Sequence, residues 1–212
     1  MRLQVAFDVM SQEEMEKRLE KIVDYIDIIE VGTPMIIDEG QKRVKYFTEK
    51  YPNKCILSDT KIMDGGKIEA DMAFANGAKI CTVCACSEDA TILEVVKSAR
   101  EHNGEVLVDL IGIKDSEIEA KAKWLDEIGV DYICIHTAFD VQGVSNNTQE
   151  QLHKVKAVVK KAQVSVAGGI KLNTLDAMMS ENPDVIIVGG AIHNAEDWQG
   201  ACKTMSDKIR NA

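Results

Sequence analysis

Short apolar stretches alternate with longer amphipathic stretches along the whole chain. Eight of the apolar stretches are rich in β-branched residues, and each ends near a polar residue or a glycine, as buried parallel strands do. The predicted strands are 3–8, 27–32, 55–61, 78–85, 105–111, 131–139, 163–170 and 184–192. The amphipathic stretches predict helices at 12–23, 38–50, 66–76, 89–102, 116–128, 150–161, 174–181 and 195–209. Gly77, Gly104 and Gly129 follow three of these helices, where a left-handed cap favours glycine.

Eight strand-and-helix units in 212 residues indicate a parallel sheet with helical crossovers. This pattern favours a single-domain (β/α)₈ barrel, a TIM barrel, over residues 1–212. An open doubly wound sheet is the alternative. Such a sheet typically carries a glycine-rich nucleotide loop after its first strand, and residues 8–12 read Asp-Val-Met-Ser-Gln instead.

The charge of the chain narrows the classes of partner. Its formal net charge is −10 and no cluster of Lys and Arg stands out, which argues against nucleic acid and against membrane surfaces. No stretch approaches the ~20 apolar residues that a membrane span needs, and the chain enters its first predicted strand without a leader-like segment. We therefore expect a cytoplasmic protein.

The six cysteines mostly lie within apolar, strand-like stretches, where a thiol packs as a small hydrophobic group. Cys81, Cys84 and Cys86 are spaced closely enough to suggest zinc. Strand alternation, however, places Cys81 on the face opposite Cys84, so reduced core thiols are the preferred interpretation.

Chemically active residues concentrate at the ends of the predicted strands. In a barrel these ends meet at one mouth, where active sites of this fold lie. Asp59 and Lys61 are two apart on one strand and share a face, and Asp64 follows in a turn with Gly65 and Gly66. The strand-end set is Asp8, Glu30, Asp59, Lys61, Asp109, His136, Gly168, Gly169, Gly189 and Gly190.

Glu30 and Asp59 end consecutive strands, which are about 4.8 Å apart if they pair. Two carboxylates at that spacing can hold one divalent ion, and an all-oxygen site completed by water and substrate suits Mg²⁺, with Mn²⁺ as a substitute. The alternative for Glu30 is a salt bridge to Lys61.

The paired glycines Gly168-Gly169 and Gly189-Gly190 end the last two strands, where barrel enzymes frequently bind phosphate. Glycine lets backbone N–H groups approach phosphate oxygens without a Cβ in between. His136 ends the sixth strand and is the candidate for proton transfer, although packing is the alternative. His102, His153 and His193 receive no role.

The spacing Asp59-x-Lys61-x-x-Asp64 matches the signature of the orotidine 5′-monophosphate decarboxylase superfamily. Within it, the chain resembles the hexulose-phosphate synthase branch over nearly its whole length. The matching segments are 27–34, 61–66, 130–137, 167–171 and 187–190.

The resemblance implies a lyase that joins D-ribulose 5-phosphate to formaldehyde through an enediolate. Glu30 and Asp59 would hold Mg²⁺, His136 would move a proton, and Lys61 would stabilise the oxyanion. Lys61 would be kept protonated by Asp8, Asp59 and Asp64, of which Asp8 and Asp64 are the predicted catalytic acids. Asp109 would orient the substrate, and the two glycine pairs would bind its phosphate.

The resemblance also implies a homodimer in which Asp64 enters the partner's site. The nearest alternative activity is that of 3-keto-L-gulonate 6-phosphate decarboxylases, which place arginines where this chain has Phe139 and Gly190. A barrel that binds a sugar phosphate without catalysis is the remaining alternative.

Overall fold

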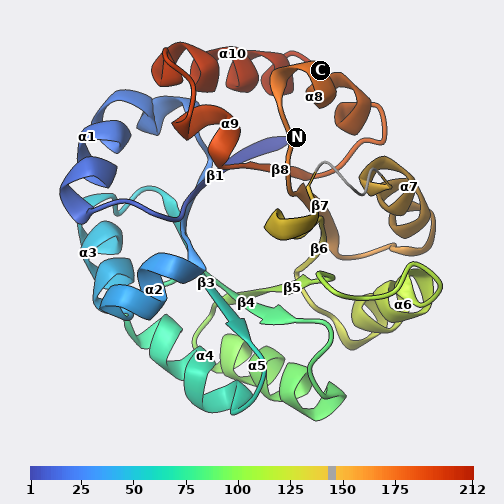
Figure 1. Cartoon of the computed structure of the whole chain (residues 1–212). Coiled ribbons are helices and arrows are strands. Elements are labelled where there is room, and N and C mark those ends of the chain that lie inside the picture. Colours follow the sequence, from blue (N-terminus) through green and yellow to red (C-terminus); the bar gives the residue numbers. More distant parts are fainter. Residues whose placement is uncertain (143–146) are drawn as a thin grey trace.

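Eight parallel strands close into a barrel in the order β1 to β8, so each strand pairs with its neighbours in sequence and β1 pairs with β8. The computed structural model describes residues 1–142 and 147–212. Figure 1 looks along the barrel, with the helices forming an outer ring. The predicted (β/α)₈ barrel is confirmed. The strands are β1 Arg2–Phe7, β2 Ile28–Val31, β3 Cys55–Ile62, β4 Ile80–Cys84, β5 Glu105–Asp109, β6 Tyr132–His136, β7 Gln163–Ala167 and β8 Val185–Val188.

The helices occur between the strands, as predicted, but several boundaries differ. They are α1 Gln12–Ile22, α2 Thr33–Glu39, α3 Lys42–Lys50, α4 Gly66–Ala75, α5 Asp89–Glu101, α6 Ile118–Ile128, α7 Thr148–Val158, α8 Leu172–Met179, α9 Gly190–His193 and α10 Trp198–Arg210. The last three predicted strands are too long. The chain turns earlier because a 3₁₀ turn forms at Phe139–Val141, Gly168 and Gly169 adopt positive φ, and α9 begins at Gly190.

The predicted helix 38–50 is wrong at its start. Two helices occupy this region, and they are separated at Gly40, which has a φ of 70°. Pro34 lies in the first turn of α2, where its missing N–H costs no helical hydrogen bond and its fixed φ favours the helix. Pro34 therefore belongs to the start of a helix and not to a loop.

Two of the three predicted glycine caps are confirmed. Gly77 and Gly129 have φ values of 88° and 83°. After α5 the left-handed residue is Asn103, with a φ of 54°, and Gly104 serves a different purpose. A Cβ at Gly104 would lie 2.3 Å from the Phe74 ring, so this glycine allows close packing between the ring and the backbone.

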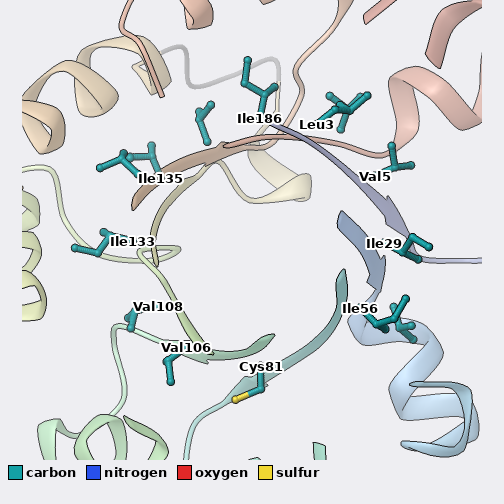
Figure 2. Packing of buried hydrophobic residues seen from close by; sticks show 14 of the residues in the cluster. Leu3, Val5, Ile29, Ile56, Cys81, Val106, Val108, Ile133, Ile135 and Ile186 are labelled. Carbon is teal, nitrogen blue, oxygen red and sulfur yellow. The ribbon is translucent and has the colours of Figure 1, made fainter. Parts of the chain in front are cut away.

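The core consists of two concentric shells. Outward-facing strand residues pack against the helices, and Figure 2 shows Val5, Ile29 and Ile133 among those that point away from the barrel centre. Inward-facing residues such as Ile28 and Leu107 fill the interior. Cys81 belongs to the outer shell, whereas Cys84 is not among its members, in agreement with strand alternation. Within the part of the chain that the structure describes, no helix is long and apolar enough to cross a membrane.

Candidate active site

The carboxyl ends of β2 to β6 bring acidic, basic and hydroxyl side chains together at one end of the barrel. Asp59 is the most connected of these groups and is only 5% exposed. Its Oδ2 accepts hydrogen bonds from Thr33 Oγ1 at 2.8 Å and from Lys61 Nζ at 2.6 Å. Its Oδ1 accepts from Thr82 Oγ1 at 2.8 Å. Three elements therefore fix the orientation of this carboxylate.

Regular strand alternation alone does not place the Lys61 side chain beside Asp59. The register between β3 and β4 shifts between Ser58 and Ile62, and Lys61 has a φ of 46°. Its N–H donates to Thr82 Oγ1 at 2.8 Å. A left-handed conformation costs a non-glycine residue about 1–3 kcal/mol, and such strain concentrates at functional sites. The irregularity in β3 thus aims the ammonium group into the mouth.

The ammonium of Lys61 forms ion pairs with Asp59 at 2.6 Å and with Asp109 at 3.3 Å. Desolvation alone would lower the pKa of Lys61, but the charges of Asp59, Asp109 and Glu30 outweigh it and raise the pKa above its ordinary value. Lys61 is therefore a permanent cation. Of the acids predicted to keep it protonated, Asp59 is confirmed as a direct partner. Asp64 forms no ion pair with Lys61 within the described chain.

Asp109 links Lys61 to His136. Its Oδ2 lies 2.7 Å from Nδ1 of His136, and its Oδ1 accepts the N–H of Ile111 at 2.9 Å. Burial would raise the pKa of Asp109, but the hydrogen bond and charge of His136, together with Lys61, lower it. Because an ionised carboxylate can only accept, Nδ1 carries the hydrogen, and Nε2 is the ring nitrogen left for proton transfer. These contacts orient the imidazole, whereas a role of Asp109 toward substrate stays a prediction.

Glu30 does not form the alternative salt bridge with Lys61 in the described residues, since the ion pairs of Lys61 go to Asp59 and Asp109. Its Oε2 instead accepts a hydrogen bond from Gln4 Nε2 at 2.5 Å. Burial and then the charge of Asp59 raise the pKa of Glu30 well above its ordinary value, which Lys61 and Gln4 oppose. Glu30 thus lies close enough to Asp59 for the two charges to repel each other.

Asp8 lies at the rim of the mouth, after β1. It remains exposed to solvent, but desolvation by the surrounding groups and then the charge of Asp59 raise its pKa. Gly32 makes room for it, because a Cβ at Gly32 would lie 2.2 Å from Asp8 Oδ1. A side chain at position 32 would displace the carboxylate.

The charge balance of the mouth fits a divalent cation. Asp8, Glu30, Asp59 and Asp109 face one ammonium, and burial and then the charge of Asp59 raise the pKa values of Asp8 and Glu30. Carboxylate oxygens are the donors that Mg²⁺ prefers, and Mg²⁺ usually keeps several waters. Within residues 1–142 and 147–212, no three His, Cys, Asp or Glu side chains form a ready-made metal cage. Binding by Glu30 and Asp59, completed by water and substrate, stays a prediction.

The glycine pairs follow β7 and β8 at the same end of the barrel. Gly168 and Gly169 have φ values of 95° and 69°. A Cβ at Gly168 would lie 2.2 Å from the carbonyl oxygen of Thr137, so packing alone already requires this glycine. The N–H groups of Gly168, Gly169 and Gly189 donate to no other backbone group among the described residues. These donors are therefore available to a ligand.

Asp64 is not part of the cluster. It is exposed, and its Oδ1 accepts the N–H of Gly65 at 2.7 Å. Apolar side chains near it are also exposed, namely Met63 at 51%, Ile68 at 65% and Met72 at 56%. A single chain thus leaves Asp64 on an apolar surface outside its own mouth.

Gln4, Thr33 and Thr82 also belong to the site, although the sequence did not predict them. Gln4 and Thr82 are polar residues inside apolar strands and point to the barrel interior, on the face of Glu30 and Asp59. Period-two alternation could have identified both. Thr33 lies in the unpredicted helix α2, and no strand pattern pointed to it.

A closed barrel with an Asp–Lys–Asp–His network at its mouth defines the class of protein. The chain belongs to the family described as "Orotidine 5'-phosphate decarboxylase / HUMPS family", whose model matches residues 1–205. This finding confirms the superfamily to which the sequence signature pointed.

Relatives within the family carry a more specific name. The chain is 43% identical over 209 residues to 3-hexulose-6-phosphate synthase of Bacillus subtilis, with 99% of each chain covered. It is 41% identical over 209 residues to the same enzyme of Staphylococcus haemolyticus, again with 99% of each covered. The crystal structure of 3-hexulose-6-phosphate synthase from Salmonella typhimurium superposes with a TM-score of 0.95 at 38% identity, covering 100% of this chain and 99% of that one.

Proposed function

We propose that this protein is a Mg²⁺-dependent aldehyde-lyase that condenses D-ribulose 5-phosphate with formaldehyde to D-arabino-hex-3-ulose 6-phosphate, reversibly and through an enediolate. The single observation that carries the proposal is the network joining His136, Asp109, Lys61 and Asp59 at the mouth. It combines a base, a fixed cation and acids that suit a metal. Full-length similarity to enzymes named 3-hexulose-6-phosphate synthase supports the same reaction.

His136 takes the proton from C1 of ribulose 5-phosphate. Its Nε2 is the free base because Nδ1 is held by Asp109 at 2.7 Å. The electrons of the broken C–H bond leave an enediolate, whose C1 attacks the formaldehyde carbon to form the new C–C bond. The formaldehyde oxygen takes up a proton and becomes the terminal hydroxyl group of the product, so atoms and electrons balance.

Lys61 stabilises the negative oxygen of the enediolate. Its charge is fixed at neutral pH, since the neighbouring acids raise its pKa. Asp59 and Asp109 hold the ammonium in place from two sides. Glu30 and Asp59 would hold Mg²⁺, which would supply a second positive centre for the same charge.

The phosphate of the substrate is bound at the end of β7 and β8. Support comes from the N–H groups of Gly168, Gly169 and Gly189, which have no backbone acceptor in the described chain. Phosphate sites after the last two strands are frequent in this fold. The sugar would then lie across the mouth with its C1 end toward His136.

The proposed assembly is a homodimer with shared active sites. The exposed apolar side chains beside Asp64 support it, because Ile68 and Met72 are four residues apart on one face of α4. Pairing of two chains over this surface would bury these residues and bring Asp64 toward the partner's mouth.

A mixing experiment tests site sharing. Asp59→Ala and Asp64→Asn chains, each inactive as homodimers, are unfolded together and refolded. Half of the dimers are hybrids, and each hybrid has one intact site only if Asp64 acts across the interface. Recovery of about a quarter of the wild-type activity is expected. No recovery would contradict a shared site.

Product analysis distinguishes the aldolase from its alternatives. The decarboxylase is disfavoured because position 139 carries an 84% exposed phenylalanine and position 190 a glycine, where that enzyme has arginines. Incubation with ¹³C-formaldehyde and ribulose 5-phosphate should give a hexulose phosphate labelled at one carbon. Release of CO₂ from 3-keto-gulonate 6-phosphate without label incorporation would favour the decarboxylase, and neither product would favour a binding protein.

A further inference from the structure

Gln4 occupies an unusual position for a polar residue. It lies on β1 inside the barrel and is only 1% exposed. The ladders pair it with Ile28 on β2 and with Ile187 on β8, and both are buried apolar residues of the barrel interior. An aliphatic side chain would therefore suit the packing of this layer.

The amide of Gln4 is only half satisfied. Nε2 donates to Glu30 Oε2 at 2.5 Å, whereas Oε1 is buried without a hydrogen-bond partner in the described chain. An unpartnered buried amide oxygen destabilises the fold. Because Gln4 weakens the core, its presence calls for a function, and its one side-chain contact identifies where that function lies.

That contact is with Glu30, the proposed metal ligand on the neighbouring strand. The ladder pairs Ala6 with Glu30, so Gln4 lies one inward-facing position below it and reaches up to the carboxylate. An ionised carboxylate can only accept hydrogen bonds, and the amide N–H of Gln4 holds one of its oxygens in a fixed direction. The other oxygen, Oε1 of Glu30, accepts no side-chain hydrogen bond within the described residues and is left for a ligand.

We infer that Gln4 is a positioning residue for divalent-metal binding, which acts through Glu30. This inference rests on the proposed function, because it assumes that Glu30 binds the metal. Gln4 orients the carboxylate toward the mouth and offsets its repulsion by Asp59. Partners of this kind typically change metal affinity by about 10- to 100-fold when they are removed.

The test measures binding of Mn²⁺ alone, by electron paramagnetic resonance of the free ion, to the full-length wild type and to Gln4→Met. Methionine has a similar length and lacks both polar groups, so thermal stability should be unchanged or higher. The Kd for Mn²⁺ should rise about 10- to 100-fold. Gln4→Leu provides a second apolar variant if Gln4→Met folds poorly.

Ser165→Ala is the matched control. Ser165 is also fully buried on an interior strand, and its hydroxyl donates to the carbonyl oxygen of Ile133 at 3.5 Å and not to the acids. The Ser165→Ala variant should bind Mn²⁺ with the affinity of the wild type. A folded Gln4→Met or Gln4→Leu variant with wild-type Mn²⁺ affinity would overturn the inference.

The Glu30→Gln variant separates the role of Gln4 from the proposed metal site itself. If this variant loses Mn²⁺ binding while Gln4→Met keeps it, only the role of Gln4 is wrong. If Glu30→Gln also binds Mn²⁺ normally, the metal site of the proposed function is wrong, and the inference about Gln4 fails with it.

Discussion

Replacing Lys61 by methionine removes the ammonium group that forms ion pairs with both Asp59 and Asp109. At an effective dielectric constant of about 20, its contacts of 2.6 and 3.3 Å correspond to gross attractions of about 6 and 5 kcal/mol. Desolvation of the charges offsets most of this. Loss of one partner of a buried pair typically costs about 3–5 kcal/mol, and we expect a loss near 3 kcal/mol because the lysine side chain is 25% exposed.

The loss should depend on pH in a defined direction. Without the ammonium, the carboxyl groups of Glu30 and Asp8 lose the positive charge that opposes their raised pKa values, and these pKa values rise further. A carboxyl group whose folded pKa exceeds its unfolded value destabilises the protein above the folded pKa, and this effect disappears as the pH falls through that value. Lys61→Met should therefore recover much of its stability relative to wild type between pH 7 and pH 5.

Urea denaturation at both pH values, with EDTA present, measures this difference. Lys208→Met is the matched control, since Lys208 pairs with Asp176 at 2.7 Å but both side chains are exposed. The control should lose less than about 1 kcal/mol at either pH. A loss at Lys61 as small as that of the control, or one that is equal at pH 7 and pH 5, would refute the electrostatic account of the mouth.

Three further predictions concern stability. Burial would raise the pKa of Asp126, but the N–H groups of residues 160–162 outweigh this effect and lower it. Asp126→Asn should therefore lower the free energy of unfolding in urea by about 2 kcal/mol at pH 7. This loss should vanish as the pH falls below about 4. Burial lowers the pKa of His193 to about 4. Calorimetry should therefore show that the wild type loses stability between pH 6.5 and pH 4, and that His193→Gln loses less over the same range. Equal pH profiles of the two proteins would contradict this. Gly168→Ala should lose more than 2 kcal/mol and raise KM for ribulose 5-phosphate, whereas Gly112→Ala, with a φ of 78° but open space, should lose only about 1 kcal/mol.

The fold was predictable because its signal is local and repeated. Each strand carries an apolar run, and most crossovers carry a helical period, so errors fell on boundaries, on α2 and on α9, which was predicted as strand. The convergence of Asp59, Lys61, Asp109 and His136 followed from the fold alone, since parallel strands bring their carboxyl ends to one edge.

Contacts that depend on register could not be predicted. The left-handed backbone of Lys61 accompanies the shift in register between β3 and β4, and no residue in β3 predicts this shift. The contact of Asp109 with His136 is also set by side-chain packing, and the expected contact of Asp109 with the substrate stays a prediction. Gln4 was overlooked because a single polar residue in an apolar strand carries no distinct signal in the sequence. Its buried position inside the barrel distinguishes it in the structure.

The central claim is metal-dependent formaldehyde fixation at this mouth. Its most direct test is the loss of formaldehyde in the presence of ribulose 5-phosphate, measured with Mg²⁺ and with EDTA for the wild type and Asp59→Ala. The account predicts consumption by the wild type with Mg²⁺, none with EDTA, and none by Asp59→Ala under either condition. Consumption that persists in EDTA or in Asp59→Ala would contradict the metal assignment, and no consumption by the wild type would contradict the proposed reaction.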